Sequence, residues 1–466
     1  MADIIFPTSS APGQRAGEGE GRLVNAHVIK EGDNLYWRRA PGLSDAFSTG
    51  QSTPRGMFEF SGELYAAYSG VVVKRTTGGS NVLLSGSLTG SDQVTFARNI
   101  KQPTADLVAC RSSGGPYVIN TSAGTVGAHP DSDLPVTVNS VDSLSGFHLY
   151  TNPTDSKIYA SDLNTTAQNA LSYATAESRP DDLIRGVTFG DTYLAFGKAS
   201  IEPWKNVGAS PFPLERHTTV VPVGLLTFGG VAGAQQGWDR NLFFVAHDGT
   251  VRELRGYNAV RISTPAVERF IADSTTSTLT AFVYTCSAGA FWVLTSDVGT
   301  WEYNVTTASW SQRQSASGTG WRAKHSAKQA ETWFLGDKLS TSFLTINSSV
   351  SKEATAALTF EVESAGLKEY PARYTIPSLF LDMTLGVGDG TTPNPVGEFA
   401  HSRDGGQTWS AWRSFNLGAA GATVGPVRFN GLGMASHNGL RIKVRVSDPV
   451  MFSLIGAEAK ITERKP

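Results

Sequence analysis

The sequence has few charged residues and lacks the basic excess that nucleic-acid-binding proteins usually carry. Charged residues make up 17% of the 466 positions, against roughly 25% in typical soluble domains. The formal net charge is −2, whereas proteins that grip nucleic acid neutralise its phosphates with clustered lysine and arginine. We therefore expect any contact with DNA to involve a surface along which DNA passes, not one that grips it.

Cysteine and long hydrophobic runs are also scarce. Cys110 and Cys286 are the two cysteines, and they lie far apart without a CxxC spacing. A disulfide framework or a cysteine zinc site is thereby disfavoured, and we predict two buried free thiols. Because no basic segment followed by an apolar run opens the chain, we expect no signal peptide. Without a stretch of about 18 apolar residues, no transmembrane helix is expected, and we predict no stable membrane insertion.

The common catalytic and cofactor motifs are missing. The histidines are scattered without HExxH or HxH spacing, and there is no GxSxG, Walker A or helix-opening GxGxxG motif. The carboxylate pairs Asp181–Asp182 and Glu18–Glu20 fall in turn-like, solvated segments, which does not favour general acid–base catalysis. We predict no catalytic residue, no metal ligand and no cofactor, and hence a protein that is not an enzyme.

Glycine, proline and short apolar runs are what the sequence does contain. Forty-nine glycines and 22 prolines separate these runs, a composition typical of an all-β protein. Between residues 54 and 345, strand pairs recur every ~40 to 50 residues, the spacing of β-propeller blades. The pairs begin near Arg55, Val141, Ile184, Gly237, Ala281 and Trp321. We predict a β-propeller of about six blades over residues 51–348; the alternative is a series of unrelated meanders in β-sandwiches.

The two ends of the chain show a different pattern. Residues 349–466 contain several strand-like runs, including 378–383 and 441–447, that suggest a β-sandwich-like domain. Residues 1–50 also carry strand signals but form no blade. We predict that residues 1–50 supply an N-terminal arm and platform strands. Together with the C-terminal β platform domain, residues 349–466, they would build one platform beneath the propeller.

Residues 402–409 match the Asp-box pattern S-x-D-x-G-x-T-W. In such a hairpin turn the aspartate accepts hydrogen bonds from its own turn, glycine tolerates positive φ, and the tryptophan anchors the following strand in the core. We interpret the motif as a structural turn, formed by Ser402, Asp404, Gly406, Thr408 and Trp409. Sialidases carry the same box, but here it occurs once and outside the blade region. Stacking of sugars on the other tryptophans is the alternative to their packing in the propeller core.

Arg441, Lys443 and Arg445 alternate along one predicted strand. Because side chains two residues apart lie on the same face of a strand, the three form a basic stripe. Two interpretations stay open. The stripe is either a solvated strand face, or it faces DNA phosphates or the acidic groups of a neighbouring subunit.

Several motifs resemble the packaged-DNA stabilisation proteins of short-tailed bacteriophages. The sequence RLVN at 22–25, RAPGL at 39–43 and RGMFEFSGELY at 55–65 is similar in order to the opening of that family. The C-terminal block is similar to the end of the same family. Its motifs are LDM at 381–383, GVG at 386–388, the Asp-box, VSDP at 446–449 and LIGA at 454–457.

The resemblance implies a tail hub, or nozzle, protein of the virion tail, assembled in the host cytoplasm. Such proteins form a ring, usually a hexamer, beneath the portal and adaptor rings of the phage neck. The ring extends the channel, helps to retain packaged DNA, offers attachment points for tail fibres or spikes, and allows double-stranded DNA to leave without sequence-specific binding. The competing hypotheses are a propeller glycosidase or sialidase and a carbohydrate-binding tail adhesin.

Overall fold

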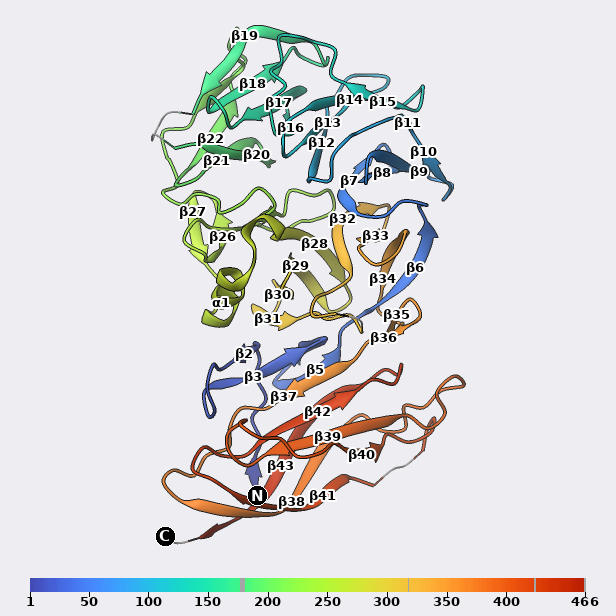
Figure 1. Ribbon diagram of the computed structural model, residues 1–466, viewed down its shortest axis with the longest axis vertical. Helices are drawn as coiled ribbons and strands as arrows, with labels where there is room; N and C mark the ends of the chain where they lie inside the picture. The colour runs from blue at the N-terminus through green and yellow to red at the C-terminus, as the bar shows by residue number, and fades with distance from the viewer. Residues whose placement is uncertain (177–180, 317, 423–424, 465–466) are drawn as a thin grey trace.

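The computed structural model describes residues 1–176, 181–316, 318–422 and 425–464. As predicted, the chain is all-β, with a β-propeller above a smaller β domain (Figure 1). In this part of the chain the helical elements are α1 (Pro265–Asp273) and a single 3-10 turn (Thr276–Thr278). Both cysteines are free; Cys110 is buried as predicted, whereas Cys286 is only half-buried.

Seven mainly antiparallel sheets surround the propeller axis within the described residues. The inner strands of most neighbouring blades contact one another, and the last inner strand, β32, packs against the first, β7. The first blade comprises β7 (Pro54–Phe60), β8 (Glu63–Tyr68), β9 (Val71–Arg75) and β10 (Asn81–Leu83), and the second comprises β11 (Ser85–Gly86), β12 (Val94–Arg98), β13 (Leu107–Arg111), β14 (Pro116–Asn120) and β15 (Thr125–Ala128). The third blade comprises β16 (Ser140–Leu144), β17 (Phe147–Asn152), β18 (Lys157–Ser161) and β19 (Gln168–Thr175). The fourth comprises β20 (Leu183–Phe189), β21 (Thr192–Gly197), β22 (Ile201–Asn206) and β23 (Leu214–Arg216). The fifth blade comprises β24 (Val231–Ala232), β25 (Leu242–Val245), β26 (Val251–Arg255) and β27 (Asn258–Arg261). The sixth comprises β28 (Thr280–Cys286), β29 (Gly289–Thr295), β30 (Thr300–Asn304) and β31 (Ser309–Gln312). The seventh comprises β32 (Ala323–Gln329), β33 (Thr332–Asp337), β34 (Ser342–Asn347) and β6 (Gly42–Ser48).

The structure therefore has one blade more than the six strand pairs found in the sequence. The additional blade is the second, β11–β15. Its inner strands β12 and β13 are joined by the polar segment 99–106 rather than by a tight turn. Because the prediction relied on apolar runs joined by short turns, it did not include this blade.

The propeller ring is closed by a strand from the N-terminal segment. Strand β6 pairs antiparallel with β34, with Leu43 opposite Ile346, and so covers the outer edge of the seventh blade. The predicted boundary at residue 51 is thus too late, because residues 42–48 belong to the propeller. Closing a ring in this way removes an edge that would otherwise expose unpaired backbone groups.

The platform is a sandwich of two sheets to which both ends of the chain contribute. One sheet contains β1 (Ala2–Asp3), β4 (Ala26–Glu31), β5 (Asn34–Arg39), β43 (Ser453–Arg464), β38 (Arg373–Met383) and β41 (Val427–Ala435). The other contains β2 (Ala11–Pro12), β3 (Gly19–Val24), β37 (Phe360–Glu363), β42 (Arg441–Val446), β39 (Val396–Ser402) and β40 (Arg413–Asn416). The short pair β35 (Lys352–Glu353) and β36 (Ala356–Ala357) extends the seventh blade beside β6. Alternating apolar residues, such as Ile442 and Val444 facing Leu379, fill one core between the two sheets.

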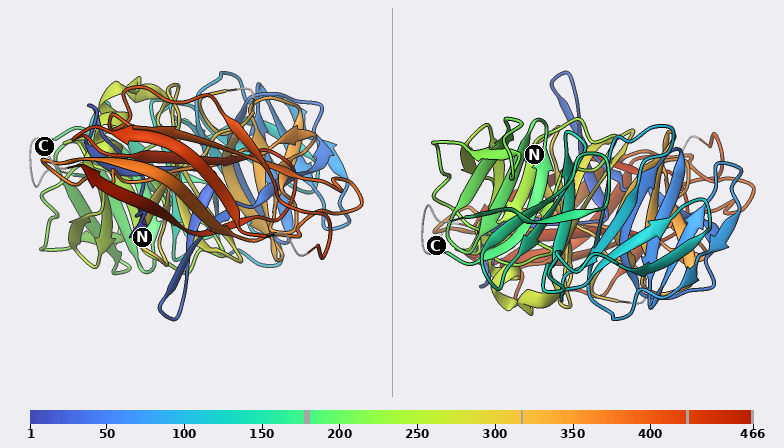
Figure 2. Two further views of the ribbon diagram at one scale, coloured as in Figure 1. Left: turned by 90° about the horizontal axis from the view of Figure 1, so that it is seen from below. Right: turned by 90° about the horizontal axis from the view of Figure 1, so that it is seen from above.

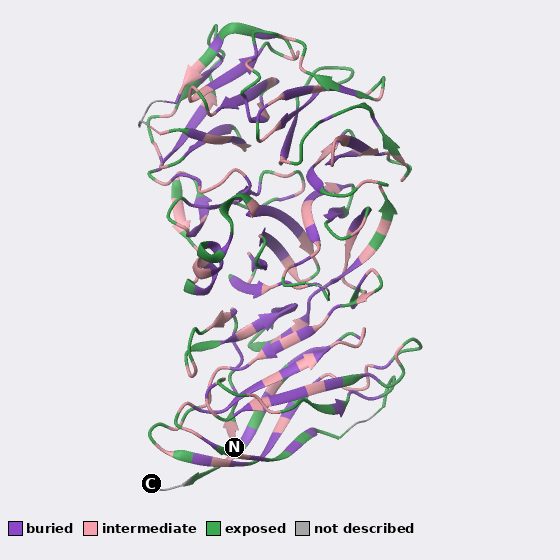
Figure 3. Cartoon of the chain, in the orientation of Figure 1, coloured by how far each residue is buried: buried purple, intermediate pink, exposed green. Residues whose placement is uncertain are grey.

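Propeller and platform share a sheet. Strand β31 of the sixth blade pairs in parallel with β3, with Gln312 opposite Val24. From β3 the ladder continues through β37 and β42 to β39 and β40, so one hydrogen-bonded sheet crosses from the propeller into the platform (Figure 1). Along these strands buried residues alternate with less buried ones (Figure 3).

Candidate functional site

The Asp-box forms a closed hydrogen-bonded turn at the end of β39. Ser402 Oγ donates to Asp404 Oδ1 at 2.7 Å, and the Gly406 N–H donates to Ser402 Oγ at 2.8 Å. Thr408 donates its N–H at 2.9 Å and its hydroxyl at 2.5 Å to the same carboxylate. Burial acts to raise the pKa of Asp404, but the bonds from Thr408 and Ser402 outweigh it and lower the pKa to about 2. The carboxylate is therefore fully used within its own turn.

Trp409 does not anchor a strand in the core, which corrects the prediction for this residue. Its side chain is half-buried on the outer face of the platform sheet. The Lys443 ammonium lies 4.0 Å from the centre of the indole ring, within the range of a cation–π contact. Strand β40 begins only at Arg413, so Trp409 lies in an irregular segment that crosses the outer face.

The basic stripe has its partners within the chain. Arg441, Lys443 and Arg445 share the outer face of β42, alternating with buried Ile442 and Val444.

Acidic residues of the two neighbouring strands neutralise this stripe. Glu363 of β37 contacts Arg441 at 3.1 Å and Lys443 at 3.4 Å, and Glu398 of β39 contacts Arg445 at 2.8 Å. Arg445 also stacks 4.0 Å from the ring centre of Trp412. These contacts leave little unpaired positive charge for phosphates.

A buried polar network joins the platform to the propeller, and sequence analysis missed it. His27 Nε2 on β4 lies 2.5 Å from Oε1 of Glu302 on β30. Tyr284 donates to Glu302 Oε2 at 2.8 Å, Ser311 donates to Oε1 at 3.2 Å, and Arg313 Nε lies 3.7 Å from Oε2. Burial acts to raise the pKa of Glu302, but the charges of His27 and Arg313 outweigh it and hold that pKa below its usual value.

Two residues of the family-like motifs bind distant backbone, Asn25 at the junction and Arg39 within the platform. Asn25 of the RLVN motif has a φ of 49°, and its side chain donates to the carbonyls of Gln314 at 2.9 Å and Thr359 at 2.8 Å. Arg39 of the RAPGL motif is buried and donates to the carbonyls of Val446 at 2.6 Å and Asp448 at 2.5 Å. Both side chains bind backbone atoms more than 280 residues away, which explains the roles of these motif positions.

One hairpin of the platform projects into solvent. Strands β4 and β5 pair along their whole length, but only Trp37 and Arg38 of β5 pair with the rest of the sheet. The tip, residues 30–35, is exposed and extends beyond the body of the molecule (Figure 2). Beside the base of the hairpin lies a groove of about 720 Å³, lined mainly by apolar side chains that include Ile5, Leu35, Trp37, Phe380 and Met383.

Among the described residues, no group of three or more His, Cys, Asp or Glu side chains could hold a metal ion. In the same part of the chain, no helix has the length and apolar character needed to cross a membrane.

The family model described as "Bacteriophage P22 Gp10, beta-propeller" (Phage_stabilise) matches residues 24–351. The chain belongs to this family. The match begins in the last residue of β3 and covers the whole propeller, including the closing strand β6. As a Gp10-family member, the protein is a phage structural protein of the DNA-stabilisation type and a component of the virion.

Solved structures similar to this Gp10-family chain are distant. The β-propeller domain of Cps50 (Swd1) from Myceliophteria thermophila is 11% identical, with a TM-score of 0.42, covering 66% of this chain and 99% of that one. PorZ of the type-IX secretion system of Porphyromonas gingivalis is 12% identical with a TM-score of 0.38, covering 80% of this chain and 46% of PorZ. The computationally designed Ika8 protein is 12% identical with a TM-score of 0.37, covering 74% of this chain and all of Ika8. No curated protein sequence matches the chain significantly.

Proposed function

We propose that this Gp10-family protein is a subunit of the tail hub, or nozzle, ring of a short-tailed bacteriophage. The ring would be a hexamer beneath the portal and adaptor rings of the neck, would extend their channel, and would carry tail fibres or spikes. It would retain packaged double-stranded DNA and let it pass at infection without sequence-specific binding.

The observation that carries the proposal is the projecting β4–β5 hairpin beside the apolar groove. A two-stranded hairpin on its own is marginally stable in water, and exposed apolar patches mark sites of protein association. Leu35 at the hairpin tip is 37% exposed, and Ile5 in the groove is 71% exposed. Contact with a neighbouring subunit would cover both features. The neutralised stripe on β42 also supports a surface along which DNA slides.

A ring-assembly experiment tests the proposal. In the altered hairpin, residues 30–35 are replaced by a two-residue Asn-Gly turn, which the opposed pair Ile29 and Tyr36 can accommodate. The matched control replaces the exposed turn 121–124 between β14 and β15 in the same way. The wild-type and control proteins should form rings by negative-stain electron microscopy, alone or with the portal–adaptor complex, whereas the hairpin variant should stay monomeric. Wild-type protein that remains monomeric with that complex present would contradict the proposal.

The glycosidase or sialidase hypothesis receives no support from the Asp-box, because the Asp404 carboxylate is bonded within its own turn. Release of fluorophore from a fluorogenic sialoside, abolished by a carboxylate substitution, would reverse this conclusion. The tail-adhesin hypothesis predicts specific binding on a glycan array.

A further inference from the structure

Three basic side chains near the propeller axis have no acidic partner within ion-pair distance among the described residues. They are Arg185 on β20, Lys324 on β32 and Lys338 just after β33. Their neighbours Arg322 and Lys328, by contrast, pair with Asp337 and Glu331. Burial lowers the pKa of Lys324, and burial together with the charge of Lys324 lowers the pKa of Lys338 to about 8.

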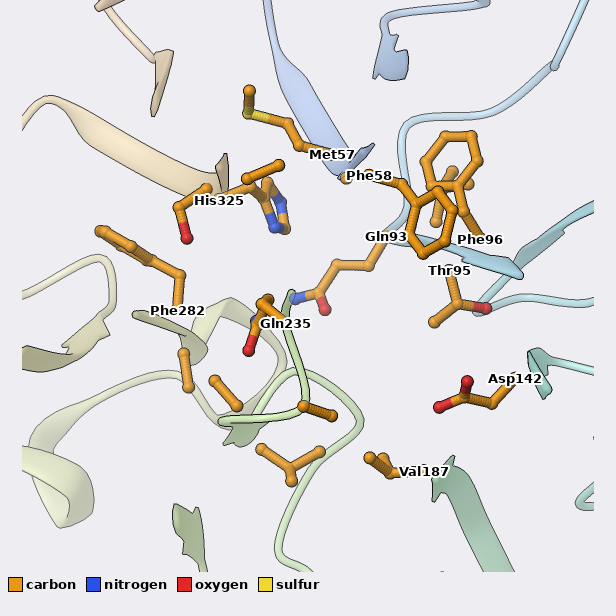
Figure 4. Close-up of a pocket in the computed structure, with 18 of the residues that line it drawn as sticks. Met57, Phe58, Gln93, Thr95, Phe96, Asp142, Val187, Gln235, Phe282 and His325 are labelled. Carbon is orange, nitrogen blue, oxygen red and sulfur yellow. The ribbon is translucent and has the colours of Figure 1, made fainter. Parts of the chain in front are cut away.

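His325 is placed toward the axis by a local distortion of β32. The pairing of β32 with β33 shifts register between Lys324 and Ser326, and His325 has a φ of 57°. Left-handed backbone is unfavourable for a residue with a Cβ and is found where a bulge re-aims a side chain. The imidazole points toward Gln93 across the axis (Figure 4). Its Nε2 is buried and has no hydrogen-bond partner among the described residues, as is also true of Arg185 Nε.

Two cavities follow one another along the axis. The inner cavity, of about 160 Å³, is lined by Asp142, Arg185, Phe282 and His325 among others. The outer one, of about 730 Å³, opens at the face of the propeller where Lys324 and Lys338 lie.

A partition separates the two cavities. Gln93, Phe228 and Gly229 line both of them, and Gln93 is fixed by its bond to Thr280 Oγ1 at 2.8 Å. Arg185 donates to the Phe228 carbonyl at 3.1 Å. Arg185 and His325 therefore line the inner cavity on one side of these residues, and the two lysines line the outer cavity on the other side.

The acidic groups of the outer cavity are already bonded to their own loops. Asp92 accepts from the Ser113 N–H at 2.8 Å and pairs with Arg55 at 3.2 Å. Asp297 accepts from the hydroxyls of Thr275 at 2.6 Å and Thr278 at 2.9 Å. In contrast, Lys338 Nζ has only a 3.3 Å bond, to Thr295 Oγ1.

The hydrogen bonds of Asp142, in the inner cavity, are likewise already made. Its carboxylate accepts from the N–H groups of Ser143 and Thr188, both at 2.8 Å. The carboxylates are thus engaged, while the lysine ammonium groups remain available.

We propose that the outer cavity, which we call the axial cup, binds an oxyanion of the phosphate type. Lys324 and Lys338 contact the anion directly through their ammonium groups. Arg185 adds positive potential from behind the partition. Inorganic phosphate and the terminal phosphate group of a nucleotide offer the same chemistry to this cup. The inference does not depend on ring formation.

Titration calorimetry of the full chain with inorganic phosphate tests this site, and a 5′-mononucleotide serves as the second ligand. Each of Lys324→Gln and Lys338→Gln should weaken phosphate binding about tenfold, as expected for loss of one charge-assisted hydrogen bond. The controls, Lys352→Gln and Lys460→Gln, each remove one charge from an exposed lysine away from the axis and should leave the affinity unchanged.

Each result supports or overturns the proposal. Binding of both ligands supports a cup that accepts a phosphate group whatever it is attached to, and binding of phosphate alone supports a small-ion site. In the variant His325→Asn, asparagine tolerates the left-handed backbone at this position, so the protein should still fold. Phosphate binding should be preserved in this variant if the lysines make the contacts. The proposal is overturned if no heat of binding is detected with phosphate at millimolar concentration, or if the lysine and control variants bind phosphate with equal affinity.

Discussion

His27 Nε2 lies 2.5 Å from Glu302 Oε1, and this contact connects the platform strand β4 to the propeller strand β30. The two residues are 275 positions apart in sequence and almost inaccessible to solvent, with side-chain exposures of 2% and 0%. Glu302 also faces the fully buried Arg313. A charged group in such a site is tolerated because its partners replace the water that it has lost.

Replacing Glu302 by glutamine should destabilise the protein strongly. Arg313 would lose its principal counter-charge in a buried site, where Glu353 is the lesser one, and breaking a buried pair in this way costs about 3–5 kcal/mol. Urea denaturation followed by circular dichroism measures the free energy of unfolding. Glu331→Gln is the matched control, because the Glu331 side chain is 95% exposed. A loss below about 1 kcal/mol for Glu302→Gln, as for a surface pair, would show that the network contributes little.

Mild acid should destabilise the fold through His148. This residue is fully buried, neither ring nitrogen has a partner among the described residues, and burial lowers its pKa to about 4. The unfolded chain binds a proton near pH 6.5 and the folded chain does not, so stability is full above that pH and falls as the pH drops toward 4. We expect a loss of about 2 kcal/mol between pH 7 and pH 5.

The variant His148→Leu identifies the group responsible for that loss. It should lose about 2 kcal/mol less than the wild type between pH 7 and pH 5, because the His148 imidazole is gone. A smaller loss should remain from other buried histidines such as His325, whose pKa is also lowered by burial. Exposed His437 provides the control, since His437→Gln should retain the wild-type pH dependence. If His148→Leu kept the same acid sensitivity, another group would be the cause.

Strand β6 should be essential for propeller stability. Leu43 is completely buried in the core of blades five to seven, and truncating a buried leucine to alanine costs about 2–5 kcal/mol. We expect Leu43→Ala to lower the free energy of unfolding within that range in a chemical denaturation experiment. Leu339→Ala removes a side chain that is 58% exposed and should change little. Equal effects in the two variants would mean that β6 does not close the ring in solution.

DNA binding by the isolated chain should be weak and should depend little on salt. The stripe on β42 has intramolecular partners, and few phosphates would be neutralised, so the slope of log K against log salt should be near zero. Fluorescence anisotropy with a short duplex measures this slope. Lys443→Gln and Arg445→Gln should each change the affinity by less than about twofold, since phosphate contacts set the salt-dependent term. A steep slope that these variants flatten would restore the DNA-facing interpretation.

The all-β fold and most of the blades could be predicted because each blade is a local pattern. Strands β7 and β8, for example, are apolar runs on either side of a Ser61–Gly62 turn with positive φ at both positions. The second blade was missed because its inner strands are joined by a long polar segment. Strand β6 was assigned to the platform because its partner, β34, lies some 300 residues later in the chain.

The junction could be predicted only in part. The RLVN and RAPGL motifs indicated a family, but nothing near Asn25 or Arg39 in sequence shows which carbonyls they bind. A signal for Glu302 does exist: it is an acidic residue inside the aromatic strand segment Trp301–Tyr303, where burial demands a partner. That partner, His27, can be identified only once the fold has brought β4 to β30. The cation–π contact of Trp409 depends in the same way on a distant strand.

The sheet continues from β31 into β3 through the Gln312–Val24 pair, so backbone pairing joins the two halves of the molecule in addition to the chain connections between them. Tension applied to the rim of the propeller passes into the platform through backbone hydrogen bonds and the buried His27–Glu302 contact. In any oligomer held together by its platforms, every propeller therefore keeps a fixed angle to its neighbours. The geometry of such an assembly is set when each chain folds, before any two copies meet.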